Sequence, residues 1–216
     1  MLKIFSLVLA ATTTMSNANP QTLRALAGAT ETPSSLGQSV VIVIDAQKEY
    51  QNGAMPLVGF SEAVAEIGRL LARARACDVP IIHVIHKAKP EAKVFDPERL
   101  YVEIVDELKP IPGEIIVEKR FPDSFTQTVL ESELQKLGRK DLVIVGFMTH
   151  MCVSSTTRDA AERGYRCNVI AAACATRDLP SIDGGVVEAQ VVHAVSLAAL
   201  RDRFAVVLKN QSFLPE

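Results

Sequence analysis

Short runs of apolar residues alternate with segments of helical periodicity along almost the whole chain, and this alternation constrains the fold most. The apolar run at residues 38–45 is followed by an amphipathic helical pattern at 59–77 and by a second apolar run at 80–86. The runs lack the polar alternation of a half-exposed strand, which is typical of strands buried on both faces of a parallel sheet. We therefore predict an α/β fold, a three-layer α/β/α sandwich around a six-stranded, mostly parallel, Rossmann-like sheet.

The remaining elements follow the same alternation. Further strands are expected at 114–119, 141–147, 166–173 and 203–208, and helices around 97–107, from Ser124 to about Leu137, from Cys152 to Arg163, and at 184–200. Ser124 and Gln127 are spaced as a helix-starting capping box, and Gly138 and Gly164 stand where helices commonly end. No repeat or linker interrupts residues 38–209, so one domain is predicted at residues 38–216.

The N-terminal residues differ from the rest of the chain. Lys3 precedes an apolar stretch at residues 4–11, and Ser16 and Ala18 are small residues suited to cleavage after Ala18. We expect residues 1–18 to be a signal peptide and residues 19–37 to be an N-terminal extension. The protein is then exported or periplasmic. An uncleaved extension on a cytoplasmic protein is the alternative.

Composition argues against two classes of partner. The net charge of the 216 residues is only −2, and neither a basic run nor a tryptophan is present, so the sequence lacks the features of a nucleic-acid-binding protein. Its longest apolar stretches have the length of strands and fall short of the roughly 18–20 residues that span a membrane. Neither nucleic acid nor membrane is expected as a partner.

The four cysteines do not suggest a disulfide. Cys167 and Cys174 flank one predicted strand, and seven extended residues span roughly 23 Å. That separation far exceeds the reach of a disulfide bond. Cys77, Cys167 and Cys174 are therefore expected to be buried free thiols.

Charged and nucleophilic residues follow the predicted strands at their carboxyl ends. Asp45 follows the first strand, His86 ends the second, Lys119 ends the third, and Cys152 lies just past the fourth. Ligands of such sheets bind at this edge, and a thiol near a helix N-terminus is favoured as the nucleophilic thiolate. Taken singly, Asp45 could cap a turn, Lys119 could be solvated and Cys152 could be structural. Their shared edge favours a catalytic site.

Three motifs resemble one family of enzymes. They are VIVIDAQ at 41–47, Glu118-Lys119 followed by Ser124-Phe125, and GFMTHMCV at 146–153. Together they resemble the isochorismatase-like cysteine hydrolases, which include nicotinamidases, N-carbamoylsarcosine amidohydrolases and streptothricin hydrolases. The resemblance covers about residues 38–208. The amino-acid sequence at 147–153 and at 175–180 is most similar to that of the streptothricin hydrolases.

The resemblance implies a catalytic triad of Asp45, Lys119 and Cys152. Asp45 would take the proton of the Cys152 thiol, while Lys119 keeps Asp45 ionised and favours the thiolate. The sulfur would attack the carbonyl of a small-molecule amide or carbamoyl group, giving a thioester that water cleaves. The backbone N–H groups of Met148 and Cys152 would form the oxyanion hole, with a cis peptide between Phe147 and Met148.

Bulky residues near the same edge are candidates for substrate binding. They are Tyr50, Phe121, Met148 and His150. Ordinary core packing is an equal alternative for each aromatic ring, and His150 could instead orient the turn before Cys152. The resemblance also suggests a homo-oligomer.

No metal ion and no other cofactor are expected. The nicotinamidases of this superfamily carry an Asp-x-His pair and a further histidine after the second strand. Here His83 and His86 stand three apart on a strand, so their side chains point to opposite faces, and residues 87–113 contain no histidine. A metal-free enzyme acting on another amide or carbamoyl group fits better than a nicotinamidase.

Two other functions remain open. Isochorismatases proper cleave a vinyl ether, lack the cysteine and use the aspartate as an acid. Alternatively, the scaffold could serve as a non-catalytic thiol sensor, for which a reactive Cys152 would suffice. A sensor would not require Asp45 and Lys119 at neighbouring strand ends, and no resolving cysteine is close in sequence.

Overall fold

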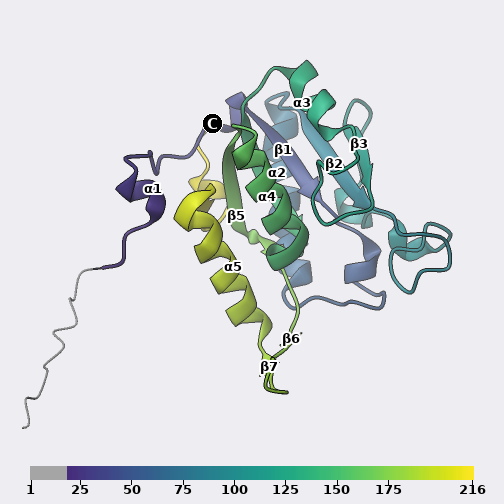
Figure 1. The fold of residues 1–216 in the computed structure, drawn as a ribbon. Coiled ribbons are helices and arrows are strands. Elements are labelled where there is room, and N and C mark those ends of the chain that lie inside the picture. Colours follow the sequence, from purple (N-terminus) through teal and green to yellow (C-terminus); the bar gives the residue numbers. More distant parts are fainter. Residues whose placement is uncertain (1–18) are drawn as a thin grey trace, which may run out of the picture.

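A central parallel sheet organises the molecule (Figure 1). The computed structural model describes residues 19–216, so the predicted signal peptide at residues 1–18 lies outside the described residues. The strands are β1 (Ser39–Ile44), β2 (Ile81–His86), β3 (Ile115–Lys119), β4 (Asp141–Phe147), β5 (Arg166–Ala175) and β8 (Ala205–Leu208). They lie in the order β3-β2-β1-β4-β5-β8, with every neighbouring pair parallel. The predicted six-stranded α/β sheet is confirmed.

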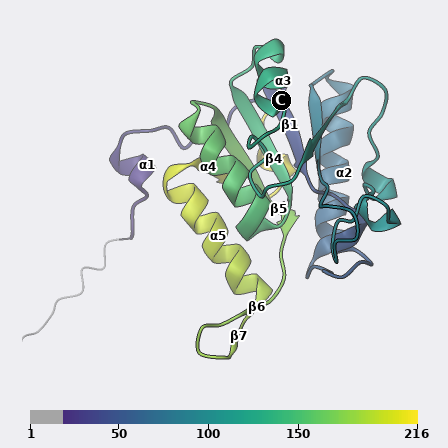
Figure 2. The same ribbon diagram turned by 45° about the vertical axis from the view of Figure 1, so that its right-hand side comes forward.

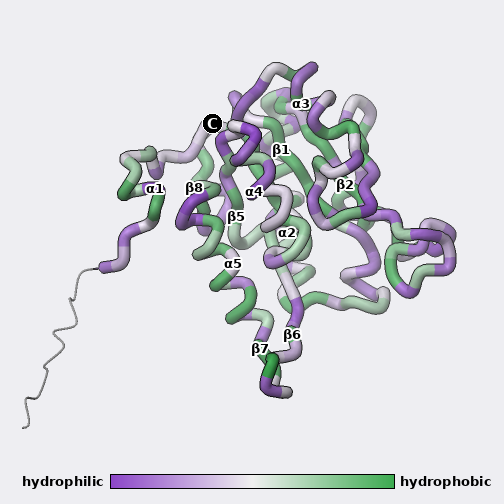
Figure 3. Tube along the Cα trace, in the orientation of Figure 1, coloured by the Kyte–Doolittle hydropathy of each residue, from purple (hydrophilic) through white to green (hydrophobic). Residues whose placement is uncertain are grey.

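Helices cover both faces of this sheet, as Figure 2 shows. The long helix α2 (Phe60–Ala76) packs on one face, and α3 (Leu130–Leu137), α4 (Ser154–Glu162) and α5 (Ala189–Arg203) pack on the other. Alternate residues of β1 point to opposite faces: Val41 and Val43 join the core under α2, while Ile42 and Ile44 join the other core. Hydrophobic residues concentrate along the central strands (Figure 3). The sheet is therefore the middle of three layers.

The strand order places a switch point beside β1. The chain runs outward from β1 through β2 to β3 and then returns to β4 on the other side of β1. Crevices outside the carboxyl ends of strands form at such points. The ends of β1, β2, β3 and β4 all meet this edge, so the residues that follow them come together.

The third helix is shorter than predicted. It begins at Leu130 rather than at Ser124, so the capping box assigned to Ser124 and Gln127 was wrong. Ser124 is instead buried against Thr156. Its backbone N–H donates to Thr156 Oγ1 at 3.0 Å, and the two hydroxyl oxygens lie 2.8 Å apart. Gln127 has a φ of 56°, in the left-handed region, which a helix does not tolerate. Tertiary contacts outweighed the local signal.

A regular helix at 97–107 was also predicted wrongly. The segment contains only two short 3₁₀ turns, at Leu100–Val102 and Asp106–Leu108. Its backbone groups bond to the segment after β1 instead: Lys48 N–H donates to Glu103 O at 2.9 Å, and Val105 N–H donates to Ala46 O at 2.9 Å. These bonds hold the loop after β2 against the edge that carries the candidate site.

The last two predicted helices begin later than expected. A π-helical turn, Thr149–Val153, comes between β4 and α4, so Cys152 lies before the helix that it was expected to begin. Helix α5 starts at Ala189, whose N–H is capped by Asp178 Oδ1 at 2.7 Å. Val186–Val187, assigned to its first turn, instead form strand β7, which pairs antiparallel with β6 (Leu179–Pro180) in a small hairpin. This hairpin projects from the body of the molecule (Figures 1 and 2).

The segment at residues 19–37 packs beside the carboxyl-terminal part of the chain. It contains the short helix α1 (Leu23–Leu26), whose first N–H donates to Asp202 Oδ1 at 2.8 Å. Further along, Leu36 N–H donates to Pro215 O at 2.8 Å. In the part of the chain that the structure describes, no helix is long and apolar enough to cross a membrane.

All four cysteines are free thiols, as predicted. Cys152, Cys167 and Cys174 are buried, but Cys77 is exposed at the end of α2, contrary to the expectation that it would be buried. Ala74 is the last buried residue of α2, and the helix ends at Ala76. Cys77 therefore lies beyond the apolar face that α2 buries.

Candidate active site

Asp45 follows β1 with its side chain completely buried. Its backbone adopts a φ of 50°, a left-handed conformation that aspartate tolerates better than most residues. Its N–H still continues the sheet by donating to Val84 O at 2.8 Å. Within residues 19–216, Oδ1 of Asp45 is buried and accepts no hydrogen bond, so this oxygen is available to take a proton.

Lys119 reaches Asp45 from two strands away. β3 and β1 are separated by β2, a distance of roughly 10 Å across the sheet, which the long lysine side chain spans. Lys119 Nζ lies 2.8 Å from Asp45 Oδ2 and 3.2 Å from Cys152 Sγ. The lysine is only 2% exposed, which rules out the solvated strand-end alternative. The structure thus brings Asp45, Lys119 and Cys152 together, as the sequence predicted.

Cys152 is held in the π-helical turn that follows β4. Val153 N–H donates to Met148 O at 3.3 Å and closes this wide turn, leaving the thiol facing Lys119. π-Helical turns are rare and occur frequently at functional sites. The Phe147–Met148 peptide is cis, as the resemblance implied.

Gly146 makes the approach of β4 to β1 possible. A Cβ atom at this position would lie 2.0 Å from Ile44 O, and the residue has a φ of 116°. Only glycine fits this combination of conformation and space. The closeness of β1 therefore requires glycine at position 146, near the end of the strand that leads to Cys152.

Burial sets the direction of the pKa shift of Asp45 and of Cys152, but not that of Lys119. Burial raises the pKa of Asp45, and the Lys119 ammonium offsets this only in part. Burial and the Asp45 carboxylate likewise raise the pKa of the Cys152 thiol, against the opposing effect of Lys119. For Lys119, burial acts to lower the pKa, but Asp45 and Cys152 outweigh it, so the pKa is raised.

With its pKa raised, Cys152 keeps its proton at neutral pH beside the Lys119 ammonium. The pKa of Cys152 moves in the direction opposite to that expected from a helix N-terminus alone. The thiolate is therefore not the resting form. It would form when Asp45, whose raised pKa makes it a stronger base than an ordinary carboxylate, takes the proton.

Two residues that sequence reasoning did not assign to the site support Lys119: His86 contacts the ammonium, and Gln47 contacts His86. His86 Nδ1 lies 3.2 Å from Lys119 Nζ, and the ammonium also donates to Phe121 O at 3.0 Å. The buried side chain of Gln47 bonds to the backbone of His86. Gln47 is the last residue of the motif at 41–47, and His86 ends the second strand. The sequence therefore drew attention to both residues but assigned a role to neither.

The predicted substrate-binding residues lie in different environments. Tyr50 is 2% exposed and packs edge-on against the rings of Phe95 and Phe147, so the structure favours the core-packing alternative. His150 is half-buried, and its Nδ1 lies 2.6 Å from Thr176 Oγ1, which orients the ring beside the turn. Phe121 is exposed at the edge of the site.

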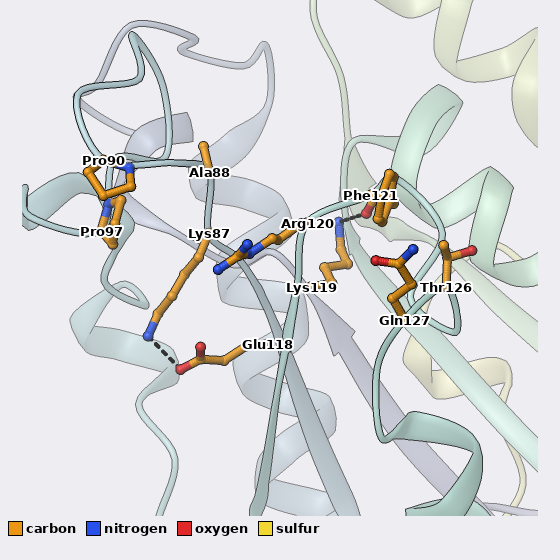
Figure 4. Close-up of a pocket in the computed structure, with 10 residues that line it drawn as sticks. All are labelled: Lys87, Ala88, Pro90, Pro97, Glu118, Lys119, Arg120, Phe121, Thr126 and Gln127. Atoms are coloured by element: carbon orange, nitrogen blue, oxygen red, sulfur yellow. Dashed lines mark hydrogen bonds and ion pairs between the residues drawn. The ribbon is translucent and has the colours of Figure 1, made fainter.

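A pocket of about 380 Å³ opens beside Lys119 (Figure 4). Phe121 and Gln127 lie on one side of it, and Lys87 on the other, paired with Glu118 at 2.5 Å. Arg120 projects between these sides. The pocket is lined by both polar and apolar residues and reaches Lys119, but Cys152 is not among the residues that line it.

The two histidines of β2 do not converge. His83 is buried and bonds through Nε2 to Glu114 Oε2 at 2.9 Å, away from His86 and Lys119. Burial is the main cause that lowers the pKa of each ring, to about 4 for His86. Among residues 19–216, no three histidine, cysteine or carboxylate side chains are grouped as a metal site would require.

Comparison with known proteins identifies the family of the chain. The isochorismatase domain family matches residues 39–212, which is most of the chain. The chain belongs to the isochorismatase family. The crystal structure of an isochorismatase from Pseudomonas putida KT2440 is similar, with 43% sequence identity and a TM-score of 0.85 over 90% of this chain and 99% of that one.

Relatives of this isochorismatase-family chain are hydrolases of more than one kind. A secreted isochorismatase effector of Verticillium dahliae is 37% identical over 188 residues, covering 87% of this chain and 96% of that protein. A streptothricin hydrolase of Streptomyces noursei is 31% identical over 141 residues, 65% of this chain and 51% of that protein. Ureidoacrylate amidohydrolases match as well. The protein is accordingly a hydrolase whose relatives include enzymes acting on C–N bonds.

Proposed function

We propose that this protein is a cysteine-dependent amidohydrolase that cleaves a C–N bond of a small-molecule amide or carbamoyl compound. One observation carries the proposal: Lys119 Nζ lies within 2.8 Å of Asp45 Oδ2 and 3.2 Å of Cys152 Sγ at the edge where such sheets bind ligands. The Lys119 ammonium thereby touches both the proposed base and the proposed nucleophile. The amidohydrolases among the relatives support the same reaction class.

In the first half of the reaction, Asp45 takes the thiol proton while Cys152 Sγ bonds to the amide carbonyl carbon. The carbonyl oxygen becomes an oxyanion, for which the backbone N–H groups of Met148 and Cys152 are the proposed donors. When the oxyanion collapses, the C–N bond breaks and Asp45 returns the proton to the departing nitrogen. A thioester on Cys152 remains.

In the second half, water completes the hydrolysis. Asp45, again ionised, takes a proton from water as the water oxygen attacks the thioester carbonyl. The C–S bond then breaks, the acid leaves, and the proton on Asp45 restores the Cys152 thiol. Lys119 stays protonated throughout, because its raised pKa keeps its charge beside two groups that alternate in carrying a negative charge.

The environment of Cys152 argues against a thiol sensor. A sensor cysteine is accessible and has a low pKa. Here the residue is 5% exposed, and burial together with the Asp45 carboxylate raises the pKa of its thiol.

Vinyl-ether cleavage is the second candidate, because the similar proteins from Pseudomonas putida and Verticillium dahliae are named isochorismatases. In that reaction Asp45 would act as an acid and Cys152 would be dispensable. The two candidates therefore differ in whether the sulfur is needed.

A panel of primary amides, cyclic amides, carbamoyl compounds and vinyl ethers tests the proposal through ammonia, amine or enol release. Cys152→Ala should reduce amide hydrolysis about 10³-fold or more, since the nucleophile is lost. Cys167→Ala is the matched control, because that thiol is equally buried but bonds only to backbone carbonyls. Full amide hydrolysis by Cys152→Ala would exclude the mechanism, and vinyl-ether cleavage by that variant would favour the second candidate.

Export is proposed from the N-terminal sequence. Its support is the apolar stretch at residues 4–11, the small residues Ser16 and Ala18, and the secreted relative from Verticillium dahliae.

A further inference from the structure

The Lys119 ammonium is surrounded by more acceptors than the two reacting groups. Besides Asp45 and Cys152, it contacts Phe121 O at 3.0 Å and His86 Nδ1 at 3.2 Å. An ammonium carries three N–H donors and accepts no hydrogen bond. Four neighbours thus face three donors, and an N–H at Nδ1 would point at the ammonium, so the 3.2 Å contact is favourable only for a neutral ring with its proton on Nε2.

The surroundings of His86 keep the ring in that form. Burial and the charge of Lys119 lower the pKa of His86 to about 4, so the ring is neutral throughout the neutral range. Lys119 is the one charged group that shifts this pKa within the described residues. The ring also packs against Phe95, with ring centres 4.9 Å apart, which limits its rotation.

Gln47 fixes the backbone that carries this ring. Its Oε1 accepts from His86 N–H at 2.8 Å and its Nε2 donates to His86 O at 2.9 Å, so the amide holds both backbone groups of one residue. The same Nε2 donates to Val102 O at 2.7 Å. Gln47 is fully buried, and it stands two residues after Asp45. The segment that supplies the base therefore also fixes the end of β2.

The position of β2 explains why a contact between His86 and Lys119 would matter. The Lys119 side chain must cross the end of β2 to reach Asp45, because β2 lies between β3 and β1. A lysine has four rotatable carbon–carbon bonds and loses considerable rotamer entropy when it is held in one place. An acceptor at the end of the crossed strand would hold the ammonium at the correct point on this path.

We propose that His86, fixed by Gln47, is a positioning residue whose ring accepts a hydrogen bond from Lys119 and holds the ammonium between Asp45 and Cys152. This inference rests on the proposed cysteine chemistry. It adds to the triad a pair of residues that do not touch the reacting atoms. It predicts that the reactivity of Cys152 depends on an acceptor at position 86.

Alkylation of Cys152 by iodoacetamide tests this without any amide substrate. Its rate is followed from pH 6 to 10 by mass spectrometry of the peptide containing Cys152. His86→Phe keeps a ring against Phe95 but removes the acceptor. In this variant Cys152 should be alkylated at least about tenfold more slowly at neutral pH, because a hydrogen bond to a charged group is lost. The pH profile of the alkylation rate should be displaced to higher pH. His86→Asn places a carbonyl oxygen near the Nδ1 position and should restore most of the rate.

Comparable melting temperatures would exclude a general loss of structure as the cause. An unchanged profile in His86→Phe, or equal loss in the Phe and Asn variants, would overturn the inference. This outcome is separable from the proposed function. If Cys152 alkylation depends on residue 86 as predicted but the protein hydrolyses no amide, only the proposed function is refuted.

A measurement on the unmodified protein covers the case in which His86→Phe does not fold. Nitrogen chemical shifts of ¹⁵N-histidine report the tautomer of each ring. The inference predicts a neutral His86 with the proton on Nε2 and an unprotonated Nδ1 from pH 6 to 8. An imidazolium, or a proton on Nδ1, at pH 7 would contradict it.

Discussion

Two opposing effects set the pKa of the Asp45 carboxyl group. Burial disfavours its carboxylate, while the ion pair with Lys119 favours it, and burial is the larger effect. Its pKa is therefore above the ordinary 3.8. A base with a raised pKa takes a thiol proton more readily, and the same carboxyl afterwards is a suitable acid for the leaving nitrogen.

These pKa directions predict the pH dependence of kcat/KM. The reaction requires ionised Asp45, so activity falls as the pH drops through its raised pKa, and the acid limb should lie above 3.8. Lys119 must stay protonated, and its pKa is raised above 10.5, so no loss is expected from this group below about pH 10. The profile is measured on the best substrate of the amide panel. An acid limb at or below pH 3.8 would contradict the role of Asp45.

At the level of residues, the sequence predicted the three side chains that the structure brings together but not the contacts that support them. Asp45, Lys119 and Cys152 could be predicted because each follows a strand whose carboxyl end must meet the others. The Gln47–His86 contact could not be predicted, because it depends on how close two loops come together. Tyr50 shows the converse: an aromatic ring beside a motif has equal chances of lining a pocket and filling a core.

At the level of elements, the strands followed their apolar pattern closely, and the helix starts did not. β1 and β4 are buried along their whole length, so hydrophobicity alone locates them. The start of α3 depended on a contact between Ser124 and Thr156, 32 residues apart, which overrode a local capping signal. The β6–β7 hairpin contains only two residues in each strand, too few for a periodic pattern.

The turn between β4 and α4 depends on Gly146. Gly146→Ala should lower the free energy of unfolding by on the order of 3 kcal/mol or more, because the new Cβ collides with Ile44 O and the φ is unfavourable. Gly138→Ala is the matched control: its φ is 66°, but a Cβ would meet nothing within 4 Å, so about 1–2 kcal/mol is expected. Urea unfolding measures both. Equal losses would show that the contact with β1 is not limiting.

At the level of the whole molecule, two hydrophobic cores hold one sheet, and the site lies at the edge where both end. The cores under α2 and under α3–α5 fix β1 and β4 from opposite sides. Packing on both faces therefore holds the strands that lead to Asp45 and Cys152. The homo-oligomer that the resemblance suggested stays a prediction, which light scattering would check.

The proposed export gives a prediction for a chain that includes residues 1–18. When the full sequence is expressed in its native cells, the mature protein should begin at Asn19, following cleavage after Ala18. Mass spectrometry of the secreted or periplasmic protein identifies this terminus. Replacing Ala18 with a bulky residue should leave the precursor uncleaved. A protein that retains residues 1–18 inside the cell would contradict export.

The covalent intermediate provides the most direct test of the account. An amide that the enzyme hydrolyses is mixed with it, the reaction is stopped with acid during turnover, and the peptides are analysed by mass spectrometry. The peptide containing Cys152 should carry the acyl group of the substrate in place of the thiol hydrogen, while those containing Cys77, Cys167 and Cys174 stay unmodified. Undiminished turnover by Cys152→Ala, with no acyl group on any cysteine of the wild type, would contradict the central claim.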